Sequence, residues 1–182
     1  MNTFRYLAPF LVLCLAQCSK DDPEASLPAA TQTGANTAGC LVDGQAFVAK
    51  SYGYDVFSPP IKGVSGGFYS DGTYRMDMNA KIGEQRMRIS LCLNGQQVGS
   101  YVLNGNPLKN PIPALSHAAY SIRIYNDSET YLTDARHTGT ATLTRVDATT
   151  GLASGTFSFT AVSDKDSTRT ISITNGRFDV KR

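Results

Sequence analysis

The sequence has no tryptophan, only two histidines and four cysteines, and no apolar run long enough to cross a bilayer. A membrane-spanning helix needs about 20 consecutive apolar residues, and the longest apolar run, residues 7–16, has only about ten. The two histidines, His117 and His137, show neither HxH nor HxxxH spacing, so no zinc site is predicted. These absences argue against a spanning helix and against a metal cofactor.

An excess of charge of one sign is also missing. Lys and Arg number 17 against 15 Asp and Glu, which leaves a net charge of +2. A nucleic-acid site needs a concentrated basic face, and here the basic residues are scattered. The densest group, Arg86 and Arg88, alternates along an expected strand and is interpreted as a solvated strand face. We therefore expect no nucleic-acid partner.

Helical periodicity is the third absence. After residue 18, no window of helical length places apolar residues at i, i+3, i+4 and i+7. Nine tyrosines, eight phenylalanines and many Thr, Ser and Gly residues are instead typical of strands and turns. The sequence predicts an all-β fold.

The N-terminus has the pattern of an export signal. Arg5 precedes the apolar residues LAPFLVLCLA, which end at Gln17 and Cys18. Leu15-Ala16-Gln17-Cys18 resembles a lipobox, which implies cleavage of residues 1–17 and lipidation of Cys18. The alternative is an ordinary secretory signal with an incidental cysteine. A lipidated Cys18 would hold the protein permanently on a membrane.

Residues 18–37 are expected to form a flexible tether, because DDPEASLPAATQTGANT contains prolines and small polar residues without periodicity. The domain should then span residues 38–182. Its apolar and polar residues alternate with period two between turn pairs such as Asp43-Gly44 and Asn94-Gly95. The expected strands are 38–42, 45–49, 64–69, 73–80, 86–93, 99–103, 118–125, 131–133, 138–146, 152–161 and 169–180.

Clean alternation predicts antiparallel sheets with one solvated face, in a single β-sandwich or flattened barrel of about ten strands. In the last strand Ile171 and Ile173 should point inward, and Asn175-Gly176 should shift the phase before Phe178 and Val180. These side chains should pack against Phe157 and Phe159.

Both ends of the domain resemble an uncharacterised Bacteroidota lipoprotein family. The segments that carry the resemblance are GTATLTR at 139–145, GTFSFTA at 155–161, GRFDVK at 176–181 and the opening LPAATQTGANT with GCLVDG. The acidic run after Cys18 similarly resembles the surface-export signal of such lipoproteins. The resemblance implies an outer-membrane lipoprotein, facing the surface or the periplasm, with a domain of unknown function and no residues of known role.

Catalytic patterns are weak. Ser65 lies in a G-x-S-x-G run, and Asp127 and His137 follow in order, but the nucleophile elbow requires a helix where another strand is expected. The glycines of this run are interpreted as marks of a bulge or a close sheet contact. The other acidic residues are interpreted as solvated turn positions. We expect no enzyme and no cofactor, with a lipid-anchored hydrolase as the less favoured alternative.

Two cysteines remain after Cys14 leaves with the signal and Cys18 is lipidated. In an oxidising compartment Cys40 and Cys92 could form a disulfide, or they could be two separately buried thiols. Both alternatives stay open.

Aromatic residues in loops are the remaining lead. Tyr52, Tyr54 and Phe57 share one expected loop, and Tyr101 precedes a proline-rich loop. Such residues can hold a glycan or a peptide, or can cap the core. The favoured function is therefore a non-enzymatic, membrane-anchored domain for binding or envelope architecture. The alternative is a lipocalin-like carrier of a small apolar ligand, and the oligomeric state is left open.

Overall fold

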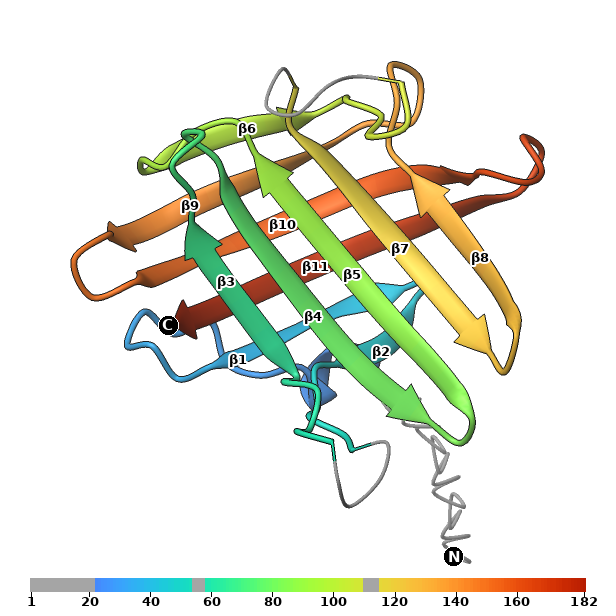
Figure 1. The fold of residues 1–182 in the computed structure, drawn as a ribbon, viewed down its shortest axis with the longest axis horizontal. Helices are drawn as coiled ribbons and strands as arrows, with labels where there is room; N and C mark the ends of the chain where they lie inside the picture. The colour runs from blue at the N-terminus through green and yellow to red at the C-terminus, as the bar shows by residue number, and fades with distance from the viewer. Residues whose placement is uncertain (1–21, 54–57, 110–114) are drawn as a thin grey trace, which may run out of the picture.

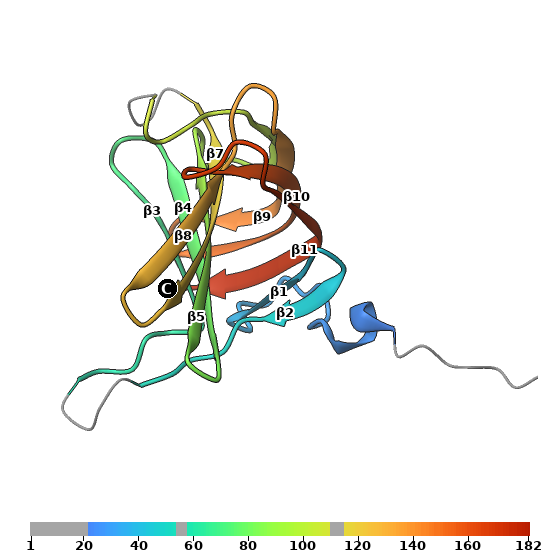
Figure 2. The ribbon, with the colours of Figure 1, turned by 90° about the vertical axis from the view of Figure 1, so that its right-hand side faces the viewer.

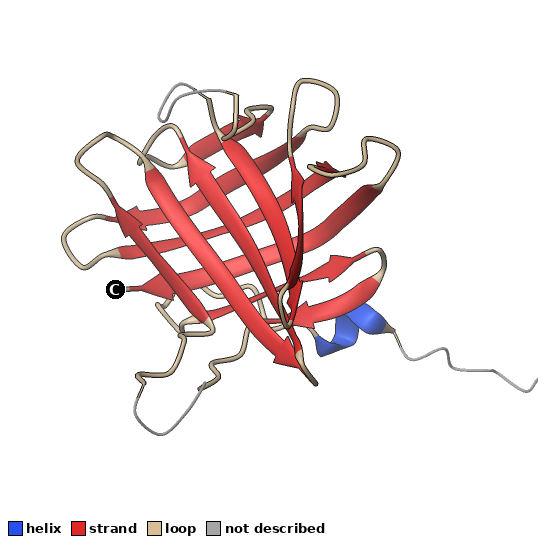
Figure 3. Ribbon diagram, turned by 45° about the vertical axis from the view of Figure 1, so that its right-hand side comes forward, coloured by secondary structure: helices blue, strands red, loops and turns tan. Residues whose placement is uncertain are grey.

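The computed structural model describes residues 22–53, 58–109 and 115–182 (Figure 1). Within these ranges a 3-10 turn, η1 (Pro23–Ser26), is followed by eleven strands, and no helix is long and apolar enough to cross a membrane (Figure 3). The strands are β1 (Thr37–Val42), β2 (Gln45–Val48), β3 (Val64–Phe68), β4 (Tyr74–Ile82), β5 (Gln85–Leu93), β6 (Gly99–Leu103), β7 (His117–Ile124), β8 (Asp127–Leu132), β9 (Gly139–Asp147), β10 (Leu152–Ser163) and β11 (Thr170–Lys181).

All strands belong to one antiparallel sheet that curls into a half-barrel. Its main path runs β2-β1-β11-β10-β8-β7-β5-β4-β3, and β9 pairs with both β10 and β6. Figures 1 and 2 show two halves that face each other, a front half of β3, β4, β5, β7 and β8 and a back half of β1, β2, β6, β9, β10 and β11. The prediction of an all-β antiparallel fold is confirmed.

The two halves join at a short seam. At the end of β10, Val162 pairs with Leu132 of β8 and Ser163 pairs with Tyr131. Because this pairing is so short, the halves diverge beyond it, and the space between them must be filled by side chains.

The core fills that space with the inward residues of both halves. Tyr74, Met76, Ile89 and Leu91 of the front half are almost completely buried. From the back half, Phe157 is 6.4 Å from both Phe159 and Phe178, ring centroid to ring centroid. The predicted inward residues of the last strand, Ile171, Ile173, Phe178 and Val180, are all buried.

The predicted phase shift in the last strand is also confirmed. The β10–β11 register is irregular between Phe157, which faces Gly176, and Phe159, which faces Ile173. Asn175 takes a positive φ of 52° in this bulge. A Cβ at Gly176 would lie 2.6 Å from the Phe157 ring, so only glycine leaves room for that ring. The bulge therefore lets one strand bury residues of both phases.

Strand β8 is longer than the predicted 131–133. Its first residues, from Asp127 to Thr130, are polar on both faces, so period-two alternation cannot reveal them. They become a strand because β7 offers partners in register, from Ile124 with Asp127 to Ala119 with Leu132.

Residues 22–36, here called the N-terminal strap, lie against the outer face of the back half (Figure 2). Leu27 is buried, and the Glu24 carboxylate accepts a hydrogen bond of 2.6 Å from Arg177 of β11. The Gln32 carbonyl accepts one of 2.6 Å from Arg145 of β9. This differs from the expected flexible tether, because a composition typical of linkers here finds specific partners on the sheet.

Candidate functional site

Four basic side chains line a groove on the outer face of the front half, beside Tyr52 and Lys62. The groove has a volume of about 600 Å³. It is named here the basic groove, and its polar and charged lining consists of Tyr52, Lys62, Ser65, Asn79, Arg86, Arg88, Ser121, Arg123, Ser128 and Thr130. Among the described lining residues four are basic and none is acidic.

The strand register brings the arginines together. Alternation along β5 places Arg86 and Arg88 on the outer face, while Met87 and Ile89 point inward. Arg86 lies directly opposite Arg123 of β7 and, on its other side, opposite Lys81 of β4. Like charges directly opposite in an antiparallel pair are destabilising. Three adjacent strands therefore carry a row of cations, Lys81, Arg86 and Arg123.

Arg88 and Lys81, two cations of this outer face, contact nearby acidic side chains. The Arg88 guanidinium donates a hydrogen bond of 3.0 Å from Nε to Asp77, and Lys81 forms an ion pair of 3.6 Å with Glu84. The hydrogen bond to Asp77 is the main cause that raises the pKa of Arg88. Arg123 is exposed, and within the described residues it has no ion pair.

Tyr52 forms one wall of the groove. Its backbone pairs with Ile61 through bonds of 3.1 Å and 2.8 Å, and its half-buried side chain is close enough to Arg88 to contribute to the raised pKa of that arginine. The buried Asn79 fastens the segment to β4, because its amide donates a bond of 3.1 Å to the Lys62 carbonyl. Tyr52 and Lys62 are thus held against the strands that carry the arginines.

The structure separates the other predicted aromatic residues from this site or does not describe them. Tyr101, on β6, donates a hydrogen bond of 2.7 Å to the Gln97 carbonyl. Strand β6 and the start of strand β3, next to Lys62, lie at opposite ends of the molecule in Figure 1, and Tyr101 is not part of the lining of the basic groove. Tyr54, Phe57 and the lipidation residue Cys18 lie outside the described residues.

Ser65 lies within strand β3, and a turn and strand β4 follow it. The close contact expected for its glycines holds for Gly66, where a Cβ would lie 2.7 Å from the Tyr74 hydroxyl, but not for Gly67, where the nearest atom would be 3.9 Å away. His137 contacts Asp134 at 3.0 Å in the turn after β8, and β8 and β3 are at opposite ends of the front half. His117 contacts the Leu115 carbonyl at 3.2 Å, and burial lowers its pKa.

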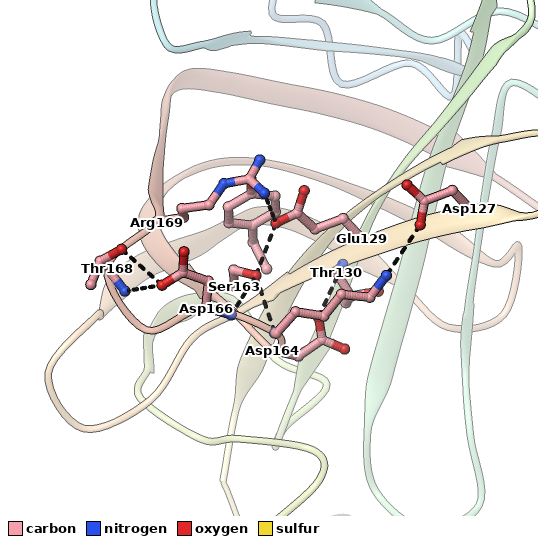
Figure 4. Close-up of polar contacts among 10 residues, drawn as sticks. Asp127, Glu129, Thr130, Ser163, Asp164, Asp166, Thr168 and Arg169 are labelled. Carbon is pink, nitrogen blue, oxygen red and sulfur yellow. Dashed lines mark hydrogen bonds and ion pairs between the residues drawn. The ribbon is translucent and has the colours of Figure 1, made fainter.

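The acidic residues near the β10–β11 turn stabilise the seam between the halves (Figure 4). Glu129 of β8 accepts a hydrogen bond of 2.9 Å from Ser163 of β10 and pairs with Arg169 at 2.8 Å. Lys165 pairs with Asp127 at 3.2 Å. Across the described ranges, no group of three or more His, Cys, Asp and Glu side chains is arranged to hold a metal ion. These residues connect β8 to β10 in addition to the short backbone pairing.

The disulfide alternative is wrong in this structure, since Cys40 and Cys92 are both free and buried. Cys40 belongs to the core, where burial raises its pKa to about 12. Cys92 lies in register with Arg75, on the opposite face of β5 from Leu91 and Leu93, and burial also raises its pKa. The two thiols thus lie on opposite faces of the sheet.

Sequence reasoning missed Lys62, Arg123 and the importance of Arg86 and Arg88. The alternation at Arg86 and Arg88 did indicate an outer strand face. What it could not show is that Arg123, 37 positions later, lies directly opposite Arg86, because register between strands is set by tertiary packing.

Comparison with known proteins gives one match. A family model described as "Domain of unknown function (DUF6252)" matches residues 68–180, from the end of β3 into β11. No curated protein and no solved structure matches the chain. The match includes Arg86, Arg88 and Arg123 but begins after Tyr52 and Lys62. Because it covers more than half of the sequence, the chain belongs to the DUF6252 family, a domain of unknown function.

Proposed function

We propose that this protein is a non-enzymatic binding lipoprotein whose ligand site is the basic groove. The observation that carries the proposal is the lining itself, which combines the Tyr52 ring with guanidinium, hydroxyl and amide groups from the 51–62 segment and five strands. A concave site with an aromatic wall and a few convergent polar groups is typical of ligand recognition.

The packing of the half-barrel supports an outer site over an interior one. A carrier of an apolar ligand would need space between the two halves, and there Tyr74, Met76, Ile89 and Leu91 are almost completely buried in one core. Tight packing of this kind has few voids larger than a water molecule. The ligand site is therefore assigned to the outer face of the front half.

The binding proposal is tested on glycan and peptide arrays with the full chain and its Tyr52→Ala variant. Loss of the ring should weaken the strongest array signal at least tenfold, because an aromatic wall contributes contact area at low entropic cost. Tyr101→Ala, at the other end of the molecule, is the matched control and should bind normally. Array binding that survives Tyr52→Ala, or that is equally reduced by Tyr101→Ala, would contradict the proposed site.

The anchor is the second part of the proposal, and it depends on the sequence alone. Residues 1–17 and Cys18 have the pattern of a lipoprotein signal, and the resemblance to Bacteroidota lipoproteins supports an outer-membrane location, facing the periplasm or the surface. Stable anchoring needs more than one acyl chain, since each buried methylene contributes about 0.8 kcal/mol.

Cys18→Ala should move the protein from the membrane fraction to the soluble fraction. Cys14→Ala is the matched control, because Cys14 lies inside the expected signal and should not carry lipid. Identical partitioning of the Cys18 variant and the wild type would show that the anchor does not depend on this residue.

A further inference from the structure

We infer that the outer face of the back half is the side of the domain that lies against the membrane, so that the basic groove points away from it. The partner of this face is the headgroup surface of the bilayer that holds the lipidated Cys18. The inference rests on the proposed lipid anchor and extends it from a location to an orientation. Three observations carry it: the attachment of the strap, the length of chain before it, and the chemistry of the face beside it.

The strap is fixed to the back half from close to its first residue. Glu24 forms an ion pair of 2.6 Å with Arg177 of β11. Leu27 is buried, and a Cβ at Gly39 of β1 would lie only 2.6 Å from the Pro28 ring. The turn η1 lies outside β1 and β2, on the side away from the front half (Figure 2). The chain therefore enters the domain on the outer face of the back half.

The chain between the anchor and this attachment is short. Cys18 and Glu24 are six positions apart, and an extended chain spans at most about 3.3–3.6 Å per residue, or roughly 20 Å here. Such a span reaches the bilayer directly from the outer face of the back half. Facing sheets lie about 10 Å apart, before the side chains of their outer faces are added. To bring the front half to the bilayer, the same span would have to run past η1, both sheets and their outer side chains, which uses its whole length.

Beside the attachment lies a face of uncharged hydroxyl groups, here called the hydroxyl face. It consists of exposed or half-buried residues of β6, β9 and β10, namely Ser100, Thr140, Thr142, Thr156, Ser158 and Thr160. The strand register places Thr142 between Ser100 and Thr156. Glu24 of the strap and four residues of this face line one hollow of about 470 Å³. Hydroxyl groups both donate and accept hydrogen bonds, so they can exchange water for lipid headgroups without burying a charge.

The orientation decides which ligands the basic groove can meet. The groove is on the outer face of the front half, and the core separates that face from the strap and the hydroxyl face. A groove that points away from the bilayer meets molecules in solution and not the lipids of the same membrane. The ligand of the groove is therefore one that arrives from solution.

Energy transfer to the bilayer tests the orientation. The lipidated full chain is reconstituted into phosphatidylcholine vesicles that carry an acceptor dye on some headgroups. A donor dye is attached either to Ser158→Cys, on the hydroxyl face, or to Ser121→Cys, in the lining of the basic groove. Cys40 and Cys92 are buried, so the introduced cysteine reacts first. Transfer from position 158 should exceed transfer from position 121 about twofold or more, because two sheets about 10 Å apart separate the positions.

Two further variants test whether the short span sets the orientation. Insertion of 20 Gly and Ser residues between Cys18 and Ser19 adds a flexible segment of roughly 25 Å and should make transfer from the two positions nearly equal. Asp179→Asn weakens the acceptor of three strap amides and should reduce the difference in the same direction. The same insertion after Thr149, in the exposed β9–β10 turn, is the matched control and should leave the difference unchanged.

Equal transfer from the two positions in the unmodified span, or stronger transfer from position 121, would overturn the orientation. A difference that survives the insertion after Cys18 would also overturn it, because the span would not be its cause. Flotation with the vesicles tests the anchor separately. Protein that floats but shows equal transfer refutes the orientation alone, whereas protein that does not float contradicts the lipid anchor and the orientation together.

Discussion

Both halves of the sheet carry charged side chains on their outer faces. The N-terminal strap lies on the outer face of the back half, whereas Tyr52 and Lys62 lie against the outer face of the front half. On the back half, the Asp179 carboxylate of β11 accepts hydrogen bonds from three consecutive backbone amides of the strap, those of Thr33, Gly34 and Ala35, at 2.9–3.0 Å. The hydroxyls of Thr31 and Ser154 donate two more, each of 2.7 Å. On the front half, Arg86 of β5 lies directly opposite Arg123 of the adjacent strand β7.

The two faces differ in what their charged side chains contribute to folding. Asp179 is buried and its negative charge is surrounded by donors from the same chain, so it stabilises the attachment of the strap. Arg86 and Arg123 instead carry like charges directly opposite each other, an arrangement that by itself does not favour the pairing of β5 with β7.

The largest loss of stability is expected from a substitution on the inner face of the sheet. Phe157→Ala should lower the free energy of unfolding by about 3–5 kcal/mol, because the cavity would lie between the Phe159 and Phe178 rings. The exposed neighbour Ser158 is the control, and Ser158→Ala should change it by less than about 0.5 kcal/mol. Urea melts measure both, and a loss below about 1 kcal/mol for Phe157→Ala would mean that the inner face is loosely packed.

Asp179→Asn should have the next largest effect, a loss of about 2–4 kcal/mol at pH 7, because several buried donors would lose a charged acceptor. Burial by itself would raise the pKa of Asp179, but the hydrogen bonds from Thr31, Ala35, Ser154 and Gly34 outweigh it and hold the pKa well below its usual range. A carboxyl group whose pKa is lower in the folded protein stabilises the fold at any pH above its pKa in the unfolded chain, about 3.9. This stabilisation is lost as the pH falls below about 3.9 towards the lower pKa of the folded state.

The wild type should therefore exceed Asp179→Asn in free energy of unfolding by the whole amount at pH 7. This excess should decrease as the pH falls below about 4. Limited proteolysis gives a second measurement, since the variant should be cut faster within residues 22–36. If the variant is as stable as the wild type and its strap is equally protected, the strap is not held by Asp179.

Tyr74→Phe should raise stability by about 1 kcal/mol, since the Tyr74 hydroxyl is buried without a hydrogen-bond partner in the described structure and burial raises its pKa. Tyr131→Phe should do the opposite, because the Tyr131 hydroxyl accepts a bond of 3.1 Å from Arg169. Thermal melts compare the two variants, and a loss of stability in Tyr74→Phe would indicate that its hydroxyl has a partner.

The smallest changes in stability are expected from the arginines on the outer face of the front half, and they test the comparison of the two outer faces directly. Arg123→Ser should raise the free energy of unfolding by about 0.2–1 kcal/mol, because it removes the repulsion with Arg86. Arg88→Ser should lower it by a similar amount, because it removes the bonds to Asp77. Both changes should be measured by urea melts at low ionic strength. A loss of stability in Arg123→Ser would show that this arginine has a structural role and would remove the contrast between the two outer faces.

Much of the fold could be predicted from local patterns. Alternation and turn pairs predicted the strands within a few residues, including the phase shift at Asn175-Gly176, because side-chain direction in a strand depends only on position along the chain. The failures were β8, whose polar residues follow no pattern, and the strap, whose polar residues have partners far away on β9 and β11. Tyr52 was predicted as a site residue by its type and its loop, and the structure places it in the groove.

By itself, the sequence determined that the chain forms antiparallel strands, which of their residues face inward, and where the chain turns, since these properties are local. Only the tertiary structure decided that the strands form one curled sheet, that Cys40 and Cys92 lie on opposite faces of it, and that Asp179 is enclosed by the strap. The tertiary structure also decided that Arg86 and Arg123 lie directly opposite each other on paired strands. Such contacts join residues far apart in the chain, and no local pattern records which strand becomes the neighbour of which.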